Sequence, residues 1–98
     1  MITKEEFYRR VTSKTMRELV KNTLSSKELA KQYLTNPNKK DIDREIDELT
    51  IKATDIFIQK LKAKGYLEDK EPTEEEFGEL LKEAINGCFN GEARNHSK

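Results

Sequence analysis

The chain has 98 residues, which suits one domain, because two would each fall below the size at which a single core usually supports folding. Hydrophobic residues make up 34% of it and charged residues 39%, and Trp is absent, so the core must be thin and suited to completion by self-association or by a partner. The net charge is zero, the one cysteine excludes an internal disulfide, and no apolar run is long enough for a secretory signal or a membrane span. We therefore expect a soluble, cytoplasmic protein.

Four segments carry the pattern of a capping box, in which a Ser or Thr is followed three residues later by Glu. They are Thr3/Glu6, Thr15/Glu18, Ser25/Glu28 and Thr73/Glu76. In this motif the hydroxyl accepts a hydrogen bond from a first-turn amide, and the Glu carboxylate accepts one from the cap amide. Each pair therefore predicts a helix start. At the first, Ile2 and Phe7 have the spacing of a hydrophobic staple.

The N-terminal region is predicted to form two helices with a break between them. Its apolar residues fall on two faces, with Phe7, Tyr8 and Val11 on one and Met16, Leu19 and Val20 on the other. One straight helix cannot bury both faces, so we place a break or kink at residues 11–15 and a second helix from Thr15 to about Leu24. A short helix is then predicted from Ser25 to residue 33 or 34, ended by Pro37.

The longest periodic stretch predicts one helix at about 39–64. Its core-facing stripe is Ile42, Ile46, Leu49, Ala53, Ile56 and Leu61, with Phe57 alongside. Gly65 can adopt the left-handed conformation that ends a helix, and Tyr66 then takes the position of a Schellman contact with Leu61. Thr73 begins the last helix, whose stripe is Phe77, Leu80, Leu81, Ala84 and Ile85.

These elements together predict an all-α fold, a compact bundle of four to five helices. Residues 1–91 are predicted to form a single helical domain. Residues 92–98 are polar apart from Ala93, and we expect them to be a disordered tail.

Residues suited to catalysis or metal binding are sparse. His96 is the one histidine and lies in the predicted tail, while Cys88 lies on the stripe of the last helix, where a small buried apolar role is the usual one. The four glycines do not cluster as a phosphate-binding loop requires. We therefore predict no enzymatic activity, no cofactor, no metal site and no small-molecule substrate.

Charge is distributed unevenly along the chain. Residues 1–40 contain ten Lys or Arg and four Glu, a net charge of +6, and residues 41–98 balance it with −6. The two halves can attract each other within the fold or across a dimer, or the basic half can steer an acidic partner.

The basic residues of the N-terminal region have helical spacing. A helix continuous across them presents Arg10, Lys14, Arg17 and Lys21 as one stripe with Arg9 beside it, whereas the predicted break divides that stripe. Such a stripe is either a solvated face or a phosphate-binding surface. Binding of nucleic acid, as an accessory protein or transcriptional regulator, is therefore the alternative function.

The long helix also carries apolar residues off its main stripe. Ile51 and Ile58 lie one heptad apart, and Asp55 and Lys62 fall on the same surface. A neighbouring helix of the same chain can cover them, or they can form a protein interface. The leading hypothesis is a non-enzymatic regulatory or interaction protein that binds another protein through a helical surface, with a homodimer as the simplest form.

Overall fold

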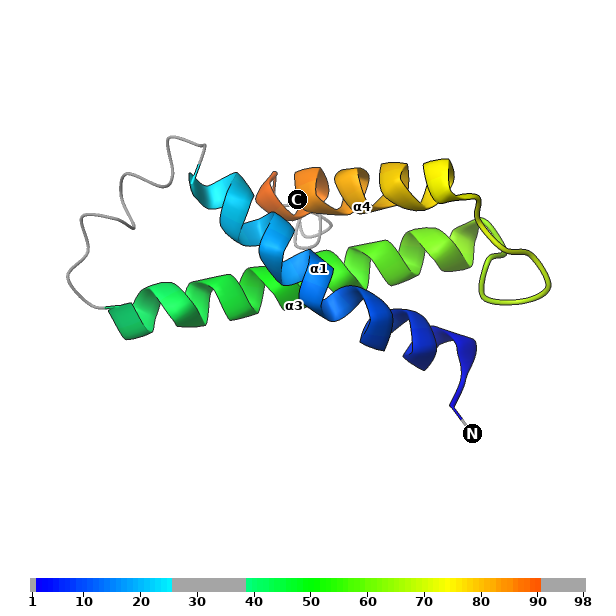
Figure 1. Ribbon diagram of the computed structural model, residues 1–98, viewed down its shortest axis with the longest axis horizontal. Helices are drawn as coiled ribbons and strands as arrows, with labels where there is room; N and C mark the ends of the chain where they lie inside the picture. Colours follow the sequence, from blue (N-terminus) through cyan, green and yellow to red (C-terminus); the bar gives the residue numbers. More distant parts are fainter. Residues whose placement is uncertain (1, 26–38, 91–98) are drawn as a thin grey trace, which may run out of the picture.

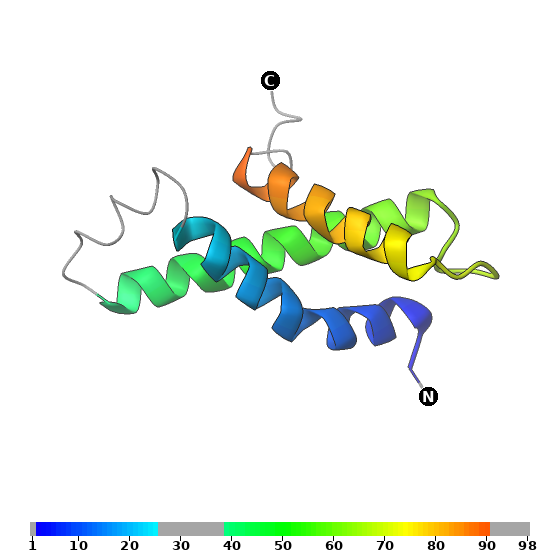
Figure 2. The same ribbon diagram turned by 45° about the horizontal axis from the view of Figure 1, so that its top comes forward.

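The computed structural model describes residues 2–25 and 39–90, and this part of the chain is helical without a strand. It contains α1 (Lys4–Ser25), α3 (Lys39–Ala63) and α4 (Glu74–Phe89). α4 runs alongside α3, and α1 crosses over α3 (Figure 1). In the turned view α3 passes behind both α1 and α4 (Figure 2). The predicted all-α class is confirmed.

The core lies where α1 and α4 meet α3. Phe57 of α3 is fully buried, and its ring meets Phe77 of α4 edge-on, with centroids 5.3 Å apart. Tyr8 of α1 reaches the same Phe77 ring at 6.3 Å. α1 and α4 each pack chiefly on α3 and touch each other little. α3 is therefore the central element of the bundle.

α1 is one continuous helix, so the predicted break at residues 11–15 is wrong. The hydroxyl of Thr12 donates to the carbonyl of Tyr8 at 2.6 Å, and that of Ser13 donates to the carbonyl of Arg10 at 3.4 Å. These hydroxyls are satisfied inside the helix and do not interrupt it. α1 buries a single row that recurs every four residues, Tyr8, Thr12, Met16, Val20 and Leu24.

The predicted count of four to five helices is also wrong for the part of the chain that the structure describes, which holds three. The Thr15/Glu18 pair lies inside α1 and marks no start. The short helix predicted from Ser25 and the tail predicted at 92–98 lie outside the described residues. At the first cap, the amide of Glu6 donates to Thr3 Oγ1 at 3.1 Å, so the predicted start there is confirmed.

The long helix is confirmed, and it ends as predicted. Gly65 has a φ of 82°. The amide of Tyr66 donates to the carbonyl of Leu61 at 2.9 Å, and that of Gly65 donates to Lys62 at 3.1 Å. These are the two hydrogen bonds of a Schellman motif, and Tyr66 and Leu61 are both buried. The reversal that leads to α4 is therefore built from local interactions.

The connector between α3 and α4 is also tied to the start of α1. Lys4 Nζ donates to the carbonyls of Glu68 and Lys70, each at 2.8 Å, and lies 3.5 Å from the carboxylate of Glu71. The ammonium group of Lys4 thus satisfies two backbone carbonyl acceptors of the connector. This attachment fixes the N-terminal end of α1 beside the connector.

α4 begins with the complete capping box. The amide of Glu76 donates to Thr73 Oγ1 at 3.1 Å, and the amide of Thr73 donates back to Glu76 Oε1 at 3.2 Å. Tyr66 also hydrogen-bonds the Glu76 carboxylate, which is the largest cause of the lowered pKa of Glu76 and of the raised pKa of Tyr66. None of the three described helices has the length and apolar composition needed to cross a membrane.

The Glu76 carboxylate should make the bundle sensitive to acid. Its folded pKa lies below the ordinary value of 4.5, so its contribution to stability is present above pH 4.5 and is lost as the pH falls toward the folded pKa. Thermal melts of wild type and Glu76→Gln between pH 7 and pH 3 should show a difference in Tm that shrinks with decreasing pH. Glu75→Gln controls for loss of a charge in the same first turn. A difference that stays constant contradicts this role.

Candidate functional site

Two arginines of α1 hold this helix against α3. Arg9 Nη1 donates to Asp55 Oδ1 at 2.8 Å, and Arg17 pairs with Asp47. The hydrogen bond with Asp55 is the main cause of the raised pKa of Arg9. These side chains remain partly exposed, so each pair contributes about 1 kcal/mol or less. Because the partners are spaced equally on the two helices, the pairs fix how α1 crosses α3.

The predicted basic stripe is continuous because α1 does not break. Its five members nevertheless divide into two groups. Arg9 and Arg17 are engaged with α3, whereas Arg10, Lys14 and Lys21 lie on the exposed side of α1. Arg10 approaches the carboxylate of Glu6, one turn earlier, at 3.7 Å. The stripe therefore serves partly to assemble the fold.

The two isoleucines of the predicted protein interface do not share an exposed surface. Ile51 is 61% exposed, but Ile58 is 4% exposed and belongs to the core. Asp55, which lies between them in the sequence, pairs with Arg9. Lys62, which follows Ile58, is exposed. For Ile58, burial favours the alternative in which a helix of the same chain covers the side chain. This residue lies on α3 between Asp55 and the connector, the two places to which the first turns of α1 are attached.

An exposed apolar row on α1 was not predicted from the sequence. Four large hydrophobic side chains are exposed among the described residues, and three of them are Ile2, Phe7 and Val11. Phe7 and Val11 were expected to face the core with Tyr8, yet they are 49% and 48% exposed. The sequence could have indicated this through the row of Tyr8, Thr12 and Met16, which is the buried one. Because Thr12 is polar, that row did not stand out as a core-facing row.

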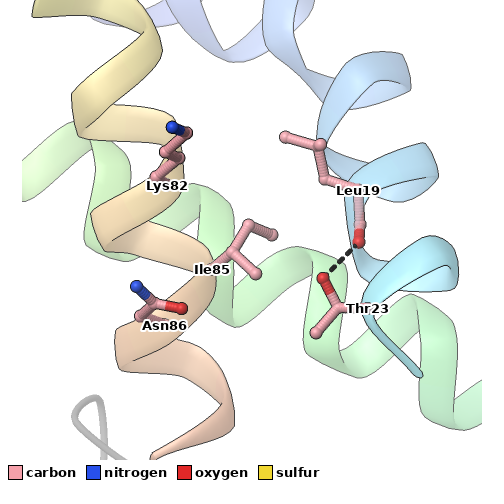
Figure 3. A pocket seen from close by; sticks show the side chains of 5 residues that line it. All are labelled: Leu19, Thr23, Lys82, Ile85 and Asn86. Atoms are coloured by element: carbon pink, nitrogen blue, oxygen red, sulfur yellow. Dashed lines mark hydrogen bonds between the residues drawn. The ribbon is translucent and has the colours of Figure 1, made fainter. Parts of the chain in front are cut away.

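A groove separates α1 from α4 on the side away from the core. It has a volume of about 230 Å³ and is lined by Leu19 and Thr23 of α1 and by Lys82, Ile85 and Asn86 of α4. Figure 3 shows these side chains projecting from two facing helices with α3 behind them. The hydroxyl of Thr23 donates to the carbonyl of Leu19 at 2.7 Å. The lining is apolar at Leu19 and Ile85 and polar at its edges.

Cys88 has a structural position in this arrangement. It is buried on α4, and its thiol donates to the carbonyl of Leu49 of α3 at 3.2 Å. Across residues 2–25 and 39–90, no three His, Cys, Asp or Glu side chains gather closely enough to hold a metal ion.

The different positions of Ile51 and Ile58 can be tested by placing a charge at each. Ile58→Lys puts an unpaired ammonium in the core and should lower the free energy of unfolding by about 3 kcal/mol or more. Ile51→Lys should change it by about 0.5 kcal/mol or less, because the new side chain reaches water. Urea denaturation followed by circular dichroism measures both. Equal effects of the two substitutions would contradict the burial of Ile58.

Comparisons with protein-family models, with curated proteins and with solved structures found no match for this chain.

Proposed function

We propose that this protein is a non-enzymatic regulatory or interaction protein and that the outer face of α1 is its contact surface. The observation that carries the proposal is the exposure of Phe7 and Val11, which lie one turn apart on α1, with Ile2 also exposed just before the helix. Large apolar side chains gathered on one face of a small domain are typical of interaction sites. Burial of a Phe or Val side chain that is otherwise exposed contributes about 1.5–3 kcal/mol.

The position of this row supports a role in binding. α1 already buries its other face, Tyr8 through Leu24, against the rest of the bundle. The outer row lies outside that buried face, and its one printed contact with it is the edge-on approach of the Phe7 ring to Tyr8, with centroids 5.7 Å apart. Its neighbours Arg10 and Lys14 are exposed cations, which provide the polar rim of a protein contact. Ile51 is exposed as a single residue on α3, away from the outer face of α1, which makes it a matched control for loss of an exposed apolar side chain.

A double substitution on the outer face tests this function. Phe7→Ser with Val11→Ser should leave the helical spectrum and cooperative melting in place, because both side chains lie outside the core. Immobilised wild type and Ile51→Ser should then capture the same proteins from a lysate of the native host, and the double variant should lose them. Capture that is unchanged by the double variant would show that this face is not the contact surface.

The second candidate function is contact with nucleic acid, and the continuity of α1 favours it. Arg10, Lys14 and Lys21 follow one side of an unbroken helix, and phosphates can lie along such a row. Because each phosphate contact releases counterions, the affinity should fall steeply with increasing salt, whereas an apolar protein contact should not depend on salt in this way.

Charge reversal on α1 decides this alternative. Arg10→Glu with Lys14→Glu should abolish the shift of a labelled DNA duplex in gel electrophoresis, and Glu75→Lys with Glu79→Lys on α4 should not. Arg17 is left unchanged in this test because it pairs with Asp47. Failure of the wild-type protein to shift the duplex at low salt rejects the alternative.

A further inference from the structure

The exposed row on α1 continues into the groove. Starting at Phe7, every fourth residue of α1 lies on one ridge, which consists of Phe7, Val11, Thr15, Leu19 and Thr23. Because four residues turn a helix by slightly more than a full turn, this ridge winds gradually around α1. Its first three members are exposed, and its last two line the groove against α4.

The α4 side of the groove has room for a further element. Gly78 lies one turn before Lys82, and a Cβ built at Gly78 would meet nothing within 4 Å. Glycine weakens a helix interior relative to alanine, and no close neighbour within the described protomer requires it at this position. Gly78 is thus compatible with the close approach of a second molecule along this side of α4.

We propose that the groove receives Phe7 from a second copy of this chain, in a symmetric dimer whose two α1 helices pack antiparallel with Thr15 at the twofold axis. This inference rests on the proposed function and names the partner of that surface. In such a pair Val11 lies opposite Leu19 of the other copy, and Phe7 lies opposite Thr23. Ridges formed by every fourth residue commonly pack against each other, and a twofold axis makes each contact occur twice.

The charges beside the ridge favour this orientation. Arg10, Lys14 and Glu18 form the adjacent row, and all three side chains are exposed. In the antiparallel pair, Glu18 of one copy lies opposite the interval between Arg10 and Lys14 of the other. A parallel pair would place each charge beside its own equivalent, which is repulsive. The charge pattern therefore favours an antiparallel pair of α1 helices over a parallel pair.

The groove can accept an aromatic ring without leaving a polar group unpaired. The Thr23 hydroxyl already donates to the carbonyl of Leu19, so covering it does not strand a buried donor. Leu19 and Ile85 provide the apolar walls. Lys82 and Asn86 lie at the edge, where their polar ends can remain in water.

Sedimentation velocity of the full chain over a range of concentrations tests the dimer. Wild type and Ile51→Ser should dimerise with the same dissociation constant, and Phe7→Ser should raise that constant by roughly tenfold or more. Circular dichroism confirms that each variant is folded. A wild type that stays monomeric, or a dimer disrupted by Ile51→Ser and not by Phe7→Ser, overturns the inference.

The antiparallel register has its own test. Thr15→Cys places two thiols across the twofold axis, so mild oxidation should give a covalent dimer quickly, while Glu79→Cys on the outer face of α4 should not. The native Cys88 is buried and contributes little to either reaction. If Thr15→Cys links no faster than Glu79→Cys, the register is wrong. Protein capture that depends on Phe7 and Val11 in a chain that remains monomeric would uphold the proposed function and reject this inference.

Discussion

The packing of α1 and α4 against α3 is the constraint on which the rest of the structure depends. Phe57 is the centre of this packing, since its ring is fully buried and meets Phe77 of α4 edge-on. Tyr8 of α1 contacts the same Phe77 ring, so one aromatic cluster joins all three helices. A chain with so few apolar residues has to place them on faces that meet α3. Little remains for a direct contact between α1 and α4.

That shortage explains the groove between α1 and α4 and the importance of polar attachments for α1. Arg9 and Arg17 join α1 to α3, and Lys4 joins it to the connector before α4. Each attachment is weak because it is near solvent. Their combined effect is geometric, since three points along α1 determine which of its rows faces inward and which faces outward.

The outward row is the surface that we propose for binding. Phe7 and Val11 are exposed at one end of a ridge that finishes in the groove beside Ile85. A symmetric antiparallel pair requires both features on the same helix. Exposed apolar side chains lie at one end of the ridge, and an apolar groove that can accept them lies at the other. Two of the basic residues of α1, Arg9 and Arg17, are paired with carboxylates of α3, so the number of basic residues in the sequence overstates the charge available to a phosphate ligand.

The sequence by itself determined the features that depend on neighbours along the chain. The capping box at Thr73, the cap at Thr3 and the Schellman end at Gly65 each involve residues within one turn, and their hydrogen bonds follow from residue type and spacing. The long helix follows in the same way from its apolar period.

Only the tertiary structure decided which apolar rows are covered. Val11 and Ile58 have similar apolar character, yet Val11 of α1 is half exposed, while Ile58 of α3 is buried in the core. The continuity of α1 was likewise decided by packing, because burial of the Tyr8, Thr12 and Met16 row outweighs the local cap signal at Thr15. Burial depends on segments far apart in the sequence, and residue spacing within one helix does not encode their positions.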